Sequence, residues 1–116
     1  MANNIAFQPM GKTVKVVATG AANTESTAFT ITADSPVNQY YISNDNVNNF
    51  AYVRINATNL FNVALPDTVS GYCLAIPPYG FKVFTSIQVG PTANVYAKVI
   101  GDATNTSVYI TPGEGL

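Results

Sequence analysis

Short runs of β-branched and aromatic residues recur along the chain, and each run is bounded by Gly, Pro, Asn or Asp. This pattern is typical of β-strands that are separated by turns. Periodicity of the helical kind is nearly absent. The runs predict strands at residues 13–19, 27–33, 39–43, 51–55, 72–76, 81–89, 95–100 and 107–111, with 60–65 as a further candidate strand.

Alternation within these runs predicts which side chains face the core. Val14, Val16 and Ala18 share one face of their run, and Phe29 and Ile31 alternate with threonines in the next. Strands of this kind have one apolar face, and two such faces must cover each other to form a core. Strands spaced about 8–12 residues apart therefore predict an all-β fold, an antiparallel β-sandwich or a barrel. We expect a sandwich that is jelly-roll-like, with an extended N-terminal arm.

The length of the chain, 116 residues, fits one domain, because a single core of ordinary size needs roughly 100–150 residues. We expect residues 12–116 to form one β-sandwich domain and residues 1–11 to form an N-terminal arm. The arm is not needed to complete the strand pattern, yet it contains apolar side chains without strand or helix spacing: Ile5, Phe7, Pro9 and Met10. We expect them to pack either on the edge of the protein's own core or on a neighbouring subunit.

Charged residues are unusually scarce. They make up 9% of the chain, against about 25% in an average globular domain. A surface so poor in charge can be buried against a partner without a large ionic desolvation cost, as in a subunit of an assembly. Nucleic-acid binding needs a basic patch. The five cations are scattered and predict no such partner: Lys12, Lys15, Arg54, Lys82 and Lys98.

The sequence offers little for catalysis. It has no histidine, no GxSxG motif and no phosphate-binding glycine loop, so the common hydrolase and nucleotide sites are not expected. The lone Cys73 can form neither an internal disulfide nor a zinc site. The acids fall in predicted turns or tails, where Asp usually caps its own backbone: Glu25, Asp34, Asp45, Asp67, Asp102 and Glu114.

Two alternatives to a protein without a catalytic or metal site remain open. A calcium site could form at residues 44–46, but the segment lacks EF-hand spacing, and we expect an Asx turn instead. An enzyme acting on cell-wall sugars would need two carboxyl groups about 5–9.5 Å apart in one groove. We expect no enzyme activity, no cofactor and no metal.

The sequence predicts no secretory signal and no membrane span. The start, MANN, has no basic region and no long apolar stretch after it, unlike a secretory signal. No run approaches the roughly 18 apolar residues that a membrane span requires. We expect a soluble protein made in a cytosol, with no membrane partner.

Three tyrosines are predicted to point outward from their strands: Tyr52, Tyr96 and Tyr109. Large amphipathic rings on a surface of low charge are typical of protein interfaces and of sugar-binding faces. Aromatic packing between neighbouring strands on an exposed face would also explain them.

Both ends of the chain resemble a known family. Residues 1–11 read MANNIAFQPMG and residues 108–116 read VYITPGEGL. These segments resemble a family of small tailed-bacteriophage proteins found among virion structural genes, with a looser likeness over 83–99. The clear match covers about a fifth of the chain, and residues 44–74 show no motif.

The resemblance implies a structural component of the phage particle, made in the host bacterial cytoplasm. Its size and β content look like those of head decoration, or cement, proteins, which bind the outer surface of the head and clamp neighbouring major capsid subunits. The expected partners are the major capsid protein and copies of the chain itself, as a dimer or trimer. A receptor- or glycan-binding fibre, tail or neck component is the alternative.

The residues expected to bind these partners come from the arm and from the outward tyrosines. The arm, with Ile5 and Phe7, would reach across a subunit boundary. The full set is Ile5, Phe7, Pro9, Met10, Tyr52, Tyr96 and Tyr109.

Overall fold

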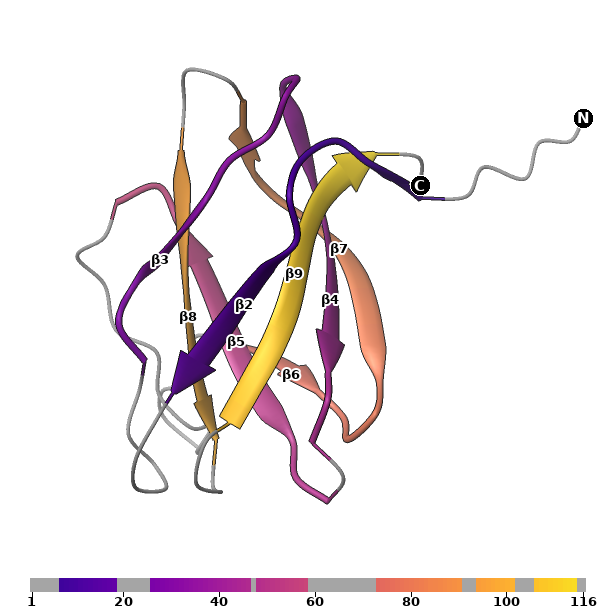
Figure 1. Ribbon diagram of the computed structural model, residues 1–116, viewed down its shortest axis with the longest axis vertical. Helices are drawn as coiled ribbons and strands as arrows, with labels where there is room; N and C mark the ends of the chain where they lie inside the picture. The colour runs from indigo at the N-terminus through magenta and orange to yellow at the C-terminus, as the bar shows by residue number, and fades with distance from the viewer. Residues whose placement is uncertain are drawn as a thin grey trace, which may run out of the picture.

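The computed structural model describes residues 7–18, 26–46, 48–58, 73–90, 94–101 and 106–114. These segments are all-β and contain no helix. Their strands form two antiparallel sheets that lie face to face (Figure 1). The strands are β1 (Gln8–Pro9), β2 (Val14–Ala18), β3 (Phe29–Ile31), β4 (Val37–Asn44), β5 (Ala51–Asn56), β6 (Leu74–Ile76), β7 (Phe81–Val89), β8 (Val95–Gly101) and β9 (Thr106–Glu114).

The two sheets have different strand orders. Sheet A has the order β1-β9-β4-β7, with β2 also paired to β9, and sheet B has the order β3-β8-β5-β6. Four of the antiparallel pairs are nested one inside the next: β2 with β9, β3 with β8, β4 with β7, and β5 with β6. Pairing of β4 with β9 and of β5 with β8 then joins neighbouring pairs within each sheet.

The core lies between the sheets and follows the predicted alternation. Val16, Ile31 and Ala18 are buried as expected, and Val14 and Phe29 are partly buried against them. Each buried aliphatic side chain contributes roughly 1.5–3 kcal/mol relative to exposure. The remaining buried hydrophobic residues of the core are Ala33, Val37, Tyr40, Ile42, Ala51, Val53, Ile76, Val89, Val95, Ala97, Val99, Val108 and Ile110.

The predicted strands are found wherever they fall in described segments, and the candidate at 60–65 lies outside them. The bounds of several strands differ from the prediction, and one whole strand was not predicted. β3 covers only Phe29–Ile31 of the predicted 27–33, and β6 begins at Leu74. The strand predicted at 39–43 runs from Val37 to Asn44. The strand predicted to end at Thr111 continues to Glu114. A two-residue strand, β1, forms within the predicted arm.

Pro112 lies inside β9 without ending the strand. The reason is that its missing N–H faces a place where the sheet needs no hydrogen-bond donor. The carbonyl of Pro112 accepts a hydrogen bond from the Met10 amide at 2.9 Å, so Pro112 directs its backbone polar groups to the β1/β2 flank of β9. There the neighbouring chain is passing from β1, which pairs up to Gly113, to β2, which pairs from Ile110. No ladder donor is needed at that point, and a central strand can hold the proline.

A buried amide links the end of sheet A to sheet B. Asn44 is 3% exposed, and its Nδ2 donates to the carbonyls of Asn49 and Ile76 at 2.9 and 3.1 Å. Its Oδ1 accepts from the amide of Asn46 at 2.9 Å. This last bond is the predicted Asx turn. The neighbouring carboxylate of Asp45 accepts a 2.8 Å bond from the Ser107 hydroxyl.

Candidate functional site

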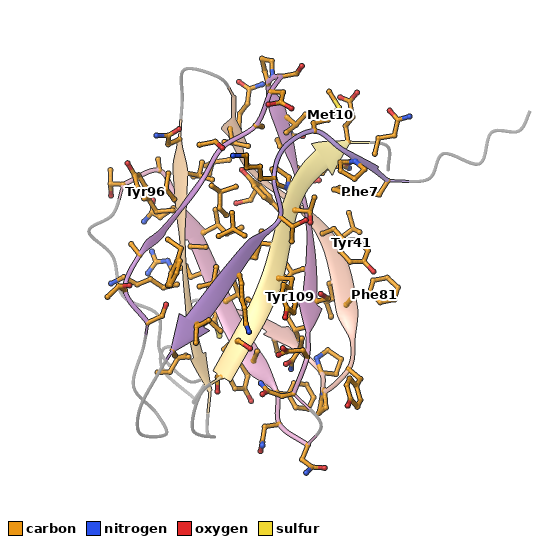
Figure 2. All side chains as sticks on the ribbon, in the orientation of Figure 1. Phe7, Met10, Tyr41, Phe81, Tyr96 and Tyr109 are labelled. Carbon is orange, nitrogen blue, oxygen red and sulfur yellow. The ribbon has the colours of Figure 1, made fainter. Side chains whose placement is uncertain are left out.

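Three aromatic rings cross the outer face of sheet A. The rings of Phe7 and Tyr41 are 5.7 Å apart between centroids and tilted by 43°. Those of Tyr41 and Phe81 are 5.2 Å apart and stacked, with 11° between planes. Figure 2 shows the three following one another on the side of β4, β7 and β9 that faces away from sheet B. We call Phe7, Tyr41 and Phe81 the aromatic row.

Strand alternation and register create the inner part of this row. Tyr40 and Ile42 point into the core and are fully buried, so Tyr41 between them must point outward. Phe81 pairs with Ser43, two residues along β4 from Tyr41. Side chains at such diagonal positions of an antiparallel pair are within reach when they are aromatic.

Phe7 reaches the row because the segment before β2 is fixed on sheet A. Pro9 pairs with Gly113 in β1, and the carbonyl of Met10 accepts a 2.7 Å bond from the Asp34 amide. Gly113 has no side chain at the point where this segment crosses β9. A Cβ there would collide with the Phe7 ring and the Gln8 carbonyl, so glycine is needed for this close approach.

A shallow groove opens beside the row. It has a volume of about 250 Å³ and is lined by Phe7, Pro9, Tyr41 and Thr111. None of these residues is charged, so the groove contains no carboxylate pair of the kind a glycosidase needs. Its volume is below the roughly 300–1,000 Å³ of pockets that enclose small molecules. The groove is suited to holding a side chain of a partner.

The other end of the row protrudes into solvent. Phe81 is 59% exposed and Tyr79 is 71% exposed. Tyr79 lies in the turn Pro77–Gly80, which is closed by a 2.9 Å bond from the Gly80 amide to the Pro77 carbonyl. Its φ of 53° is in the left-handed region, which is unfavourable for a residue with a Cβ. The turn therefore holds an exposed ring in a strained conformation.

The turn is also attached to the body of the protein. The Tyr79 amide donates to the Asn46 carbonyl at 3.1 Å, and the Asn44 amide donates to the Gly80 carbonyl at 3.0 Å. These bonds connect it to the segment that the buried Asn44 amide organises. The ring of Tyr79 is thus carried by backbone that is held on both sides.

The outer face of sheet A is almost uncharged. By alternation and register, its outward positions are mostly Thr, Ser, Val, Gln and aromatic residues. Lys15 is the one charged residue among these strand positions, and its ammonium lies 5.6 Å from the centre of the Tyr109 ring, which is a cation–π distance. The scarcity of charge in the sequence is therefore also found on this face.

The residues expected to bind partners divide between several places. Phe7 and Pro9 line the groove. Met10 packs against the hydrophobic core, which is one of the two positions expected for the apolar residues of the arm. Ile5 lies outside the described residues.

The three outward tyrosines are half-buried on outer faces, but they do not form one patch. Tyr109 lies on sheet A, next to Lys15. Tyr52 and Tyr96 lie on sheet B, where Tyr52 stacks on Phe50 with centroids 6.2 Å apart. In Figure 2, Tyr96 is accordingly far from Tyr109 and from the aromatic row.

Sequence reasoning missed Tyr41, Phe81 and Tyr79 as candidate site residues. The alternation around Tyr41, between buried Tyr40 and Ile42, contained the signal that it faces outward. Nothing local indicated that it would meet Phe7 and Phe81, because the three come from distant parts of the chain.

Two titratable groups in the described segments have pKa values raised by burial. Burial raises the pKa of Tyr40 to about 12, and its hydroxyl donates a 2.6 Å bond to the Ile87 carbonyl. Burial also raises the pKa of the Cys73 thiol, which disfavours the nucleophilic thiolate. In the described segments, no three His, Cys, Asp or Glu side chains lie close enough to hold a metal ion. No helix among the same residues is long and apolar enough to cross a membrane.

Comparisons with protein-family models, with curated proteins and with solved structures find no match to this chain.

Proposed function

We propose that the chain is a structural subunit of a tailed-phage particle, a decoration protein that binds the outer surface of the head and stabilises contacts between major capsid subunits. The observation that carries this proposal is the aromatic row with its groove on an almost uncharged sheet face, a surface suited to contact another subunit of an assembly. Exposed aromatic side chains on a face depleted of charge are typical of the centre of protein interfaces. The resemblance of both chain ends to small virion proteins supplies the kind of assembly.

The physical basis of such a role is burial repeated over many sites. Covering Phe81 and Tyr79, which are 59% and 71% exposed, removes apolar area from water at roughly 25 cal/mol per Å². One contact of this size is weak. A shell that repeats the contact at every site gains from avidity without any new interaction.

The nested strand pairs support a jelly-roll fold. Eight strands, β2 to β9, pair as one long antiparallel ribbon folded over itself, first with last and inward to β5 and β6. Jelly rolls built from such ribbons occur in viral capsid and lectin domains. Fold alone does not decide function, so this point supports the proposal only by analogy.

An N-terminal arm fits the position of Phe7. This residue reaches the outer face of sheet A at the edge of the groove, so the residues that precede it connect to that face. In the proposal, the segment containing Ile5 extends from there across a subunit boundary. Deleting residues 2–6 should then lower the amount of chain bound to particles, and unchanged occupancy would reject this role of the arm.

Copy number tests the function itself. Mass spectrometry of purified virions of the encoding phage should find the chain in hundreds of copies, in a fixed ratio to the major capsid protein. Absence of the chain from the virion would refute the proposal. A handful of copies would point instead to the fibre, tail or neck.

A receptor- or glycan-binding component is the second candidate, and the exposed ring of Tyr79 is the observation that favours it. Sugars stack on open ring faces. Tyr41 does not offer one, because Phe81 stacks on its ring and Phe7 packs beside it. Binding of the chain to host cells or purified cell-wall glycans, lost in Tyr79→Ala, would favour this candidate.

A further inference from the structure

We propose that the partner of the sheet A face is a second copy of the chain, in a two-fold dimer where each copy inserts its protruding Tyr79 and Phe81 toward the groove of the other. This inference rests on the proposed function, since it names the partner of the same surface. Contacts to the capsid would then be made by the arm and by other faces.

The face contains both parts of such a contact. The groove lined by Phe7, Pro9, Tyr41 and Thr111 has a volume of about 250 Å³, which is enough to admit an aromatic side chain. Phe81, whose ring stacks on Tyr41 at the groove, is 59% exposed, and Tyr79, two residues before it in the chain, is 71% exposed. We call the exposed rings of Phe81 and Tyr79 the knob. In a two-fold contact every interaction occurs twice, so the knob of each copy can meet the groove of the other.

Charge also favours a second copy over a charged partner. The outward strand positions of sheet A carry one charged residue, Lys15, and its ammonium lies over the Tyr109 ring. An almost neutral face can meet its own copy without like-charge repulsion. An acidic or basic partner would find few ion pairs there to offset the desolvation of its own charges.

The area of the face sets the expected strength. The longest strands of sheet A, β7 and β9, have nine residues each. At about 3.4 Å per residue and 4.8 Å between strands, the face measures roughly 30 by 15 Å, or on the order of 900 Å² for both copies. Stable specific interfaces bury about 1,200–2,000 Å². The dimer should therefore be weak in isolation.

Rigid presentation of the knob partly compensates for the small area. Tyr79 lies on a turn held by backbone bonds from Gly80 to Pro77, from Tyr79 to Asn46 and from Asn44 to Gly80. Little backbone freedom remains to be lost on binding, which lowers the entropic cost of association. The strained φ of 53° at Tyr79 is consistent with a ring positioned for contact.

The first experiment measures self-association of the full chain. Sedimentation equilibrium up to about 1 mM should show a reversible monomer–dimer equilibrium with a Kd in the micromolar to millimolar range. Phe81→Ala and Tyr79→Ala should each weaken it at least about tenfold. Tyr96→Ala, which removes a half-buried tyrosine from sheet B, is the matched control and should leave the Kd unchanged. Circular dichroism and urea unfolding confirm that each variant is folded.

Complementation tests the two-fold geometry. Thr111→Trp should fill the groove and prevent self-association, and so should the double variant Tyr79→Ala/Phe81→Ala, which lacks the knob. A mixture of the two should form a heterodimer, because one knob still meets one intact groove. Failure of the mixture to associate, with both variants folded, would overturn the knob-and-groove arrangement.

Other outcomes separate this inference from the proposed function. A chain that stays monomeric at about 1 mM, or a dimer weakened by Tyr96→Ala and not by Phe81→Ala, would overturn the inference even if virions contain hundreds of copies. A dimer that behaves as expected would support the inference even if the chain were absent from virions.

Discussion

Replacing Asn44 by alanine should lower the free energy of unfolding by about 3 kcal/mol. The magnitude follows from three hydrogen bonds of a side chain that is 3% exposed: Nδ2 to the carbonyls of Asn49 and Ile76, and Oδ1 from the amide of Asn46. A typical bond contributes about 1 kcal/mol net, and a buried group left without its partner costs about 1–3 kcal/mol. In a chain of this length the loss corresponds to a fall in Tm of roughly 10–15 °C.

Urea unfolding followed by circular dichroism measures this loss. The matched control is Asn56→Ala, because the Asn56 Oδ1 accepts one exposed bond from the Ala57 amide at 2.7 Å. Loss of an exposed bond should change stability by about 0.5 kcal/mol or less. A decrease below about 1 kcal/mol for Asn44→Ala would refute the argument that this amide fastens the two sheets together.

The isosteric change Asn44→Asp provides a pH signature. It keeps an acceptor for the Asn46 amide but loses both donors and directs a carboxylate at the carbonyls of Asn49 and Ile76. Burial and these carbonyls should raise the pKa of the new carboxyl above its unfolded value of about 3.9. The native state then binds more protons than the unfolded state, so this variant should gain stability as the pH falls from 7 toward that value. An equal free energy of unfolding of Asn44→Asp at pH 7 and at about pH 5 would contradict the raised pKa of its carboxyl.

Three further changes are expected to have distinct effects. Gly113→Ala should displace the segment before β2, because a Cβ there collides with the Phe7 ring. Faster hydrogen exchange of the Met10 amide would show this displacement. The control Gly90→Ala, whose Cβ would meet its nearest atom at an ordinary 3.4 Å, should leave the exchange rate unchanged. Tyr79→Gly should raise stability by up to about 1 kcal/mol in urea unfolding by removing left-handed strain, and Tyr79→Val should lower it. Because the pKa of Tyr40 is raised to about 12, its contribution to the free energy of unfolding should be fully present below about pH 10. Above that pH the free energy of unfolding should fall by up to about 1.4 kcal/mol per pH unit. Tyr40→Phe should flatten that alkaline decline, and a decline of the same slope would refute the assignment.

Local patterns predicted the strands well because the side-chain period of two reports burial directly. Val16 and Ile31 were expected inward from alternation alone, and each is fully buried. The errors arise where a distant partner overrides a local signal. Asn44 has low strand propensity, but bonds to Asn49 and Ile76 hold it at the end of β4.

The candidate site was predictable only in part, since it depends on register. Phe7 and Pro9 were expected to contact something, and they line the groove. Phe7 and Phe81 both contact Tyr41 because strand pairing brings together residues that are far apart in the chain. Composition does not encode such pairings, so the outward tyrosines were grouped by residue type although they lie on two different faces.

The nested pairing has a consequence for synthesis in the cell. β9, which leaves the ribosome after every other described strand, lies in the interior of sheet A between β2 and β4. Until it emerges, β2 has no neighbour in its sheet among the described strands, and the β4–β7 pair presents the unfilled edge that β9 will occupy. Native sheet A therefore closes only after translation has reached β9, and nascent chains on one polysome would expose edges that can pair with one another.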